Sequence, residues 1–144
     1  MALEQCIVDD VAAILAGLPM SLRARHLIPE SVAAEVIDRE SRERLEFMLE
    51  SGLARLVEDP PVERVASMLP GRLASKLSRA DLTVLAVALE ARGECGSVAV
   101  ATDDYALQEA AATLGFGVVR VRYPGSRVVR KWASKRRGGG SSKS

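Results

Sequence analysis

Residues 97–104 read SVAVATDD, an apolar run that ends in a threonine and two acids. The small and β-branched residues at 97–101 predict a strand buried on both faces, which is typical of a parallel sheet. Residues 105–114 follow with helical spacing and end before a glycine, and 118–121 form another apolar run. Strand, helix and strand in this order predict parallel pairing, because parallel neighbours need helical crossovers.

The same alternation extends toward the N-terminus. Strands are predicted at 5–8, 26–28 and 54–57, and helices at 11–18, from 29 onward, at 42–50, at 61–69 and at 80–91. Pro29 suits a helix entrance, since the first turn leaves its N–H groups unbonded. We therefore expect a three-layer α/β/α domain with a central parallel sheet over residues 1–123, followed by a basic, flexible tail at 124–144.

Length and composition limit the class of protein. The chain has 144 residues, 48% of them hydrophobic and 27% charged, which suffices for one core and is short for two. It contains no apolar stretch near the roughly 20 residues of a membrane span and no signal-peptide pattern, so we expect a cytoplasmic protein. Cys6 and Cys95 form neither a CxxC motif nor a metal set with His26, and we expect both cysteines to be small core or loop residues.

Charge is divided unevenly along the chain. Residues 1–119 carry 11 of the Lys and Arg and all 19 acids, a net charge of −8, whereas residues 120–144 carry 9 Lys and Arg and no acid. Such a basic segment would bind an anionic polymer by counterion release, with an aromatic ring stacking on bases. The predicted RNA contacts are Arg127, Arg130, Lys131, Trp132, Lys135, Arg136 and Arg137. The alternative is a solubilising tail.

Acidic residues fall at the ends of strands or early in helices. Asp9 follows one predicted strand, and Asp103 with Asp104 follows another, while Glu35 and Asp81 lie in first turns of predicted helices. Right-handed crossovers would bring all of them to the carboxyl edge of the sheet, where α/β proteins bind ligands. Gathered carboxylates are hard oxygen ligands that suit Mg²⁺ or Mn²⁺, so the pattern predicts a metal-dependent nuclease.

Each acid also has a purely structural interpretation. Ser78 and Asp81 have the spacing of a capping box, and Asp103 could cap the helix from 105. Glu35 lies on a charged stretch that could be a solvated face. Asp9 has the weakest structural alternative, because a carboxylate that ends a buried strand is costly unless it is paired or bound to metal.

Several motifs together carry a family resemblance. The segments Ile7-Val8-Asp9, Pro29 to Glu35, Ser78-x-x-Asp81 and Thr102-Asp103-Asp104 resemble the ordered motifs of the PIN-domain ribonucleases. Within that superfamily, residues 35–41, 77–81, 102–108 and Arg130-Lys131-Trp132 resemble the archaeal NIN-one-binding endonucleases, which mature the 3′ end of small-subunit ribosomal RNA. The resemblance covers about residues 5–132.

The resemblance implies a site and a substrate. Its catalytic and metal-binding acids would be Asp9, Glu35, Asp81 and Asp104, with Asp103 also at the metal and with Ser78 and Thr102 as polar supports. The cofactor would be Mg²⁺ or Mn²⁺, and the partner would be precursor small-subunit RNA or a pre-ribosomal particle. Two features depart from the family: a basic segment stands where members carry a zinc ribbon, and Asp10 stands where small polar residues are usual. Asp10 could add charge or cap the helix from 11.

The predicted mechanism is hydrolysis of an RNA phosphodiester by a metal-activated water. No nucleophile and base pair is evident, and His26 is expected to be a packed or surface residue away from the acids. Two alternatives stay open: a VapC-type PIN toxin with the same chemistry on other RNAs, and a catalytically slow RNA-binding assembly factor.

Overall fold

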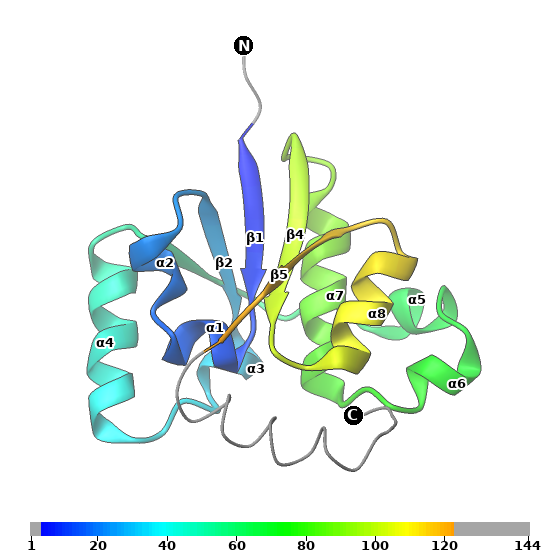
Figure 1. Ribbon diagram of the computed structural model, residues 1–144, viewed down its shortest axis with the longest axis horizontal. Helices are drawn as coiled ribbons and strands as arrows, with labels where there is room; N and C mark the ends of the chain where they lie inside the picture. The colour runs from blue at the N-terminus through cyan, green and yellow to red at the C-terminus, as the bar shows by residue number, and fades with distance from the viewer. Residues whose placement is uncertain (1–3, 123–144) are drawn as a thin grey trace.

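The computed structural model describes residues 4–122, so the predicted tail at 124–144 and its RNA contacts lie outside the described residues. These residues form a five-stranded sheet in the order β3-β2-β1-β4-β5 (Figure 1). The strands are β1 (Gln5–Asp9), β2 (Arg25–Pro29), β3 (Ala54–Val57), β4 (Ser97–Thr102) and β5 (Gly117–Arg120). Every neighbouring pair is parallel, which confirms the predicted sheet.

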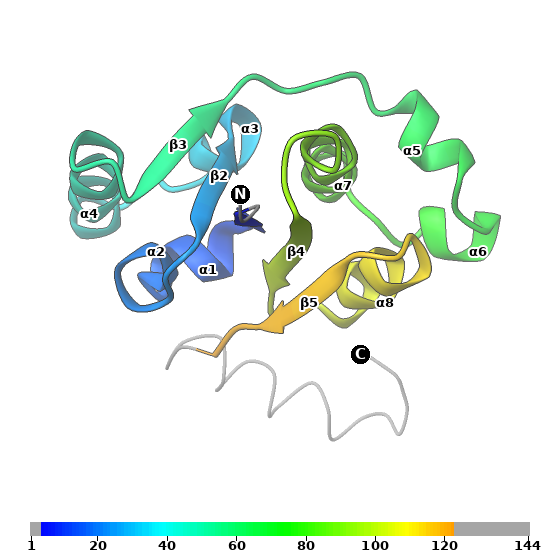
Figure 2. The same cartoon turned by 90° about the horizontal axis from the view of Figure 1, so that it is seen from above.

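Helices cover both faces of the sheet. They are α1 (Val11–Leu15), α2 (Leu18–Ser21), α3 (Glu30–Ala33), α4 (Arg39–Glu50), α5 (Glu63–Ser67), α6 (Gly71–Ala74), α7 (Arg79–Ala91) and α8 (Tyr105–Thr113). Figure 2 shows α1, α2 and α4 on one face and α3, α7 and α8 on the other, with α5 and α6 outside α7 and α8. The three-layer α/β/α prediction is confirmed, and no helix within residues 4–122 is both long and apolar enough to cross a membrane.

Burial follows the sequence pattern closely in the centre of the fold. In β4, residues Val98 to Thr102 are all buried, as expected for a central strand covered on both faces. Along that strand Ala99 and Ala101 pack with Ile7 beneath α1, whereas Val98 and Val100 belong to the larger core. Because side chains alternate along a strand, this pattern determines toward which face of the sheet the residue at each strand end points.

Two predicted helices are shorter than expected. The helix predicted at 11–18 is two short helices, because Gly17 adopts a left-handed φ of 69° between them. The helix after Pro29 ends at Ala33, so the placement of Glu35 within a helix was wrong. Arg42 donates from Nη1 to the carbonyl oxygens of Ala33 and Val36, at 3.0 and 3.3 Å, and stabilises this early exit. Helix α6 was not predicted.

The two cysteines form a disulfide, which corrects their prediction as separate core or loop residues. The Cys6 and Cys95 Cα atoms lie 6.0 Å apart, although 89 residues separate them in sequence. Parallel pairing of β1 with β4 explains the contact: Gln5 pairs with Ser97, and the turn before β4 lies beside the start of β1. The crosslink therefore joins the two central strands at the end opposite to the predicted site.

Candidate active site

The carboxyl edge of the sheet brings β1, β4 and β5 together with the first turns of α1, α7 and α8. At its centre is Thr102, whose hydroxyl donates to Asp10 Oδ2 and accepts from the backbone N–H of Asp104 at 3.0 Å. The backbone N–H of Asp10 donates to Ala101 O at 3.1 Å. Gln108, 8% exposed, donates from Nε2 to the Thr102 carbonyl at 3.0 Å. Thr102 thus holds two acids in fixed relation.

Three acids at this edge cap helices. Asp10 caps α1 by accepting from Ala13 N at 3.2 Å, which is one of the two roles expected for it. Asp81 forms the predicted capping box, since its carboxylate accepts from Ser78 N at 3.0 Å while its own N–H donates to Ser78 Oγ at 3.1 Å. The expected cap of α8 at Asp103 was wrong, because the cap is Asp104, which accepts from Ala106 N at 3.0 Å.

The carboxylates of this edge lie close enough to disfavour one another's ionisation. Burial raises the pKa of Asp10 to about 7; hydrogen bonds from Thr102 and Ala13 oppose the rise, and the charges of Asp103 and Asp81 add to it. Burial likewise raises the pKa of Asp81, and the charges of Asp104 and Glu35 contribute. The predicted acids Glu35, Asp81, Asp103 and Asp104 therefore share one electrostatic field, and Asp10 belongs to it.

This donor set fits a divalent cation in chemistry and charge. Carboxylate oxygens are the ligands that Mg²⁺ and Mn²⁺ prefer, and a cation would stabilise the charged carboxylates, which burial and then mutual repulsion disfavour here. Within residues 4–122, no three potential metal-binding side chains already converge into a preformed metal centre. The caps explain why: each of the three capping carboxylates is held at its own helix by hydrogen bonds.

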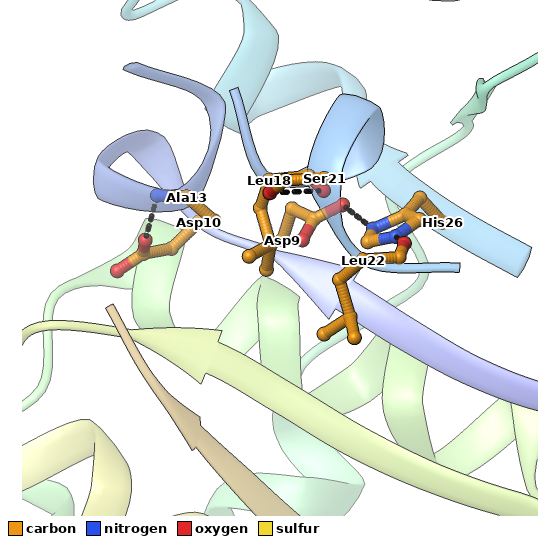
Figure 3. Close-up of polar contacts among 7 residues, drawn as sticks. All are labelled: Asp9, Asp10, Ala13, Leu18, Ser21, Leu22 and His26. Carbon is orange, nitrogen blue, oxygen red and sulfur yellow. Dashed lines mark hydrogen bonds and ion pairs between the residues drawn. The ribbon is translucent and has the colours of Figure 1, made fainter. Parts of the chain in front are cut away.

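Asp9 lies apart from this cluster, in a buried pair with His26 (Figure 3). Its Oδ2 is 2.7 Å from His26 Nδ1, and His26 Nε2 is 2.7 Å from the carbonyl oxygen of Leu22. Both side chains of the pair are 0% exposed. Asp9 Oδ1 has no hydrogen-bond partner among the described residues. The expectation that His26 lies away from the acid motifs was therefore wrong.

Strand geometry explains both Asp9 and Asp10. Ile7 pairs with His26 across β1 and β2, and Asp9 lies two residues beyond Ile7 on the same face, so its side chain reaches the imidazole. Asp10 continues the extended backbone with φ −90° and ψ −173°, so its side chain takes the opposite direction, toward Thr102. Because side chains of adjacent strand residues point to opposite faces of the sheet, the sequence could have indicated that Asp9 and Asp10 have different neighbours.

Three described arginines lie at the end of β5 and in the first turn of α7. Thr102 pairs with Arg120 in the sheet register, and Val121 N–H donates to the Thr102 carbonyl at 3.1 Å. Arg120 and Arg122 are both exposed beside this contact, and Arg79 is exposed in the first turn of α7.

Comparisons with known proteins bear on this site. No family model matches the chain. It is 42% identical over 126 residues to the protein named Ribonuclease VapC3 of Aeropyrum pernix, across 85% of this chain and 91% of that one. It is 35% identical over 136 residues to the protein named Endoribonuclease Nob1 of Pyrococcus abyssi, across 92% of this chain and 78% of that one.

Proposed function

This chain belongs to the PIN-domain ribonucleases, and from this premise we propose that its acidic edge hydrolyses RNA phosphodiesters with a divalent cation, Mg²⁺ or Mn²⁺. The observation that carries the proposal is the Thr102 hydroxyl, which donates to Asp10 and accepts from the backbone N–H of Asp104, so that acids from the first turns of two helices meet at one strand end; the charges of Asp103 and Asp81 also contribute to the raised pKa of Asp10. Carboxylates that disfavour one another's charge at a strand edge are typical of a functional site.

In this proposal Asp10, Asp81 and Asp104 hold the cation, while Asp103 and Glu35 add negative charge around it. The cation, when bound, lowers the pKa of a water and stabilises charge on the phosphate that is attacked. The family resemblance predicts Asp9 as a ligand of the cation, and this role stays a prediction. We assign the role to Asp10 instead, because its carboxylate meets Thr102 and feels the charges of Asp103 and Asp81, whereas the Asp9 carboxylate is fully enclosed beside His26.

The residues around the acids orient them and bind the substrate. Thr102 and Gln108 fix Asp10 relative to Asp104 through the hydrogen bonds described above. Arg120 and Arg122 bind substrate phosphates beside the carboxylates, because cations there offset the repulsion between an RNA backbone and the acidic edge.

The substrate that we propose is a precursor of small-subunit ribosomal RNA, supported by the likeness to a protein named Endoribonuclease Nob1. A second candidate is a toxin-type ribonuclease acting on other RNAs, supported by the 42% identity to a protein named Ribonuclease VapC3. Both candidates use the same acidic edge, so they differ in substrate and not in mechanism.

The experiment that tests the proposal compares substrates and metals in one assay. The full chain is incubated with precursor small-subunit RNA, a transfer RNA and an unrelated messenger RNA, each with Mn²⁺, with Mg²⁺ or with EDTA. We expect cleavage that depends on the metal and is confined to a few positions in the precursor. Preferential cleavage of the other RNAs would support the toxin-type candidate, and equal cleavage in EDTA would contradict the metal site.

A further inference from the structure

We propose that His26 is a positioning residue for the cleavage site: its imidazole holds Asp9, and through Asp9 it fixes the backbone that presents Asp10. This inference rests on the proposed function. His26 is fully enclosed beside Asp9, so neither side chain can touch a substrate, and a role as a catalytic base is excluded. The effect of the pair on cleavage must therefore pass through the residues that it holds.

The imidazole joins three elements of the fold. His26 lies in β2, its Nδ1 contacts Asp9 at the end of β1, and its Nε2 contacts the carbonyl of Leu22, where α2 ends. Both contacts measure 2.7 Å, which is the short end of the range for nitrogen and oxygen partners. The ring thus links the start of β2 to the end of β1 and to the end of α2 through these two hydrogen bonds.

Hydrogen counting shows that the contact with Asp9 holds a shared proton. A carbonyl oxygen only accepts, so Nε2 must donate to Leu22. The hydrogen between Nδ1 and Asp9 Oδ2 then belongs either to an imidazolium beside a carboxylate or to a neutral acid beside a neutral ring. Both arrangements leave the pair with no net charge, so a stable buried contact persists without any other charged partner.

The path from this pair to the cation site is short. Asp9 and Asp10 are consecutive, and a single peptide unit separates their Cα atoms. Asp9 pairs with Ala101 in the β1–β4 register, and Asp10 N–H donates to the carbonyl of the same residue. A shift at the end of β1 would therefore move Asp10 relative to Thr102, which holds its carboxylate.

Two substitutions of His26 each keep one of the two hydrogen bonds of the imidazole and remove the other. In His26→Asn the amide nitrogen takes roughly the place of Nδ1 and keeps a donor toward Asp9. In His26→Gln the amide nitrogen takes roughly the place of Nε2 and keeps a donor toward Leu22. Each variant loses one of the two hydrogen bonds. Asparagine is smaller than glutamine by one methylene, so lost volume alone would make His26→Asn the more damaged variant, which is the reverse of the order expected from positioning.

The readouts are the Mn²⁺ affinity by calorimetry, the kcat and KM of RNA cleavage, and the midpoint of thermal unfolding. We expect both variants to unfold at lower temperature. His26→Gln should lose at least tenfold in Mn²⁺ affinity and in kcat with little change in KM, whereas His26→Asn should stay within about threefold of the wild type. Equal losses in the two variants, or losses that only follow their unfolding temperatures, would overturn the positioning role.

A further variant keeps the proposal testable if neither histidine variant folds. In Asp9→Asn the amide can donate to Nδ1 of a neutral imidazole, so the hydrogen bond between residues 9 and 26 is kept. The loss of Mn²⁺ affinity should therefore be at least tenfold smaller than in Asp10→Asn. An equal or larger loss in Asp9→Asn would overturn the proposal, since it would make Asp9 a ligand. A wild-type chain that neither binds Mn²⁺ nor cleaves RNA would instead refute the proposed function, and the positioning role with it.

Discussion

Asp10→Asn should make the metal-free protein more stable above pH 7 and leave its stability unchanged below pH 4. Burial, opposed by its hydrogen bonds and reinforced by Asp103 and Asp81, raises the pKa of Asp10 from 3.8 to about 7. Between these values the folded chain binds a proton that the unfolded chain has released, so wild-type stability falls as pH rises. Asparagine carries no charge at any of these pH values, and the variant avoids this loss.

The magnitude follows from the size of the shift. Three pKa units at 1.36 kcal/mol each give a ceiling of about 4 kcal/mol, which is reduced in practice because the Asp10 side chain is partly exposed. Asparagine also caps helices well, so the contact with Ala13 should survive. The difference in the free energy of unfolding between Asp10→Asn and the wild type should therefore increase gradually from pH 4 and become constant above pH 8.

The assay is chemical denaturation in EDTA from pH 4 to 8.5 for the wild type and Asp10→Asn. Glu43→Gln is the matched control, since it also neutralises one acid but on the exposed side of α4. Contributions from other buried groups, such as Asp9 with His26, are common to all three proteins and cancel. A difference that stays constant across pH, or an Asp10→Asn protein less stable than the wild type at pH 8, would refute this reasoning.

Three other predictions concern the disulfide, the N-cap of α8 and the basic C-terminal segment. Reduction of the disulfide between Cys6 and Cys95 should lower the free energy of unfolding by about 4 to 5 kcal/mol, because a crosslink across 89 residues restricts the unfolded chain. Guanidinium denaturation measures this loss, and a variant with both cysteines replaced by serine should not respond to reductant. Asp104→Asn should keep the cap of α8 and lose most cleavage, while Asp104→Ala should also lose about 1 kcal/mol of stability; wild-type cleavage in both would remove Asp104 from the site. Deleting 124–144 removes seven cations. The slope of log RNA affinity against log salt concentration should become shallower by roughly 0.7 for each phosphate contact that is lost. An unchanged slope would mean that this segment does not touch RNA.

Local patterns predicted the sheet and the edge that carries the site. The strand at 97–101 and the helix at 80–91 were evident because their apolar spacing is a property of adjacent residues, and the acids were placed because parallel strands end at one edge. Sequence patterns did not predict that Asp9 contacts His26 while Asp10 contacts Thr102, because these contacts depend on where β1 ends and on which residues the sheet sets beside it.

Contacts that depend on register between distant strands were not predictable from local patterns. The pairing of Asp9 with His26 spans 17 residues, and the disulfide spans 89. Both follow from which residues the sheet sets side by side. Disulfides are uncommon in cytosolic proteins outside hyperthermophiles, so the cytoplasmic location stays a prediction.

We propose that Asp10, and not its neighbour Asp9, binds the cation at the acidic edge. Single-turnover cleavage of RNA at saturating Mn²⁺, measured for Asp9→Asn, Asp10→Asn and the Glu43→Gln control, tests it most directly. We predict that Glu43→Gln cleaves like the wild type and that Asp10→Asn is slower than Asp9→Asn by at least tenfold. Wild-type cleavage by Asp10→Asn together with a severe loss in Asp9→Asn would show that Asp9 is the ligand.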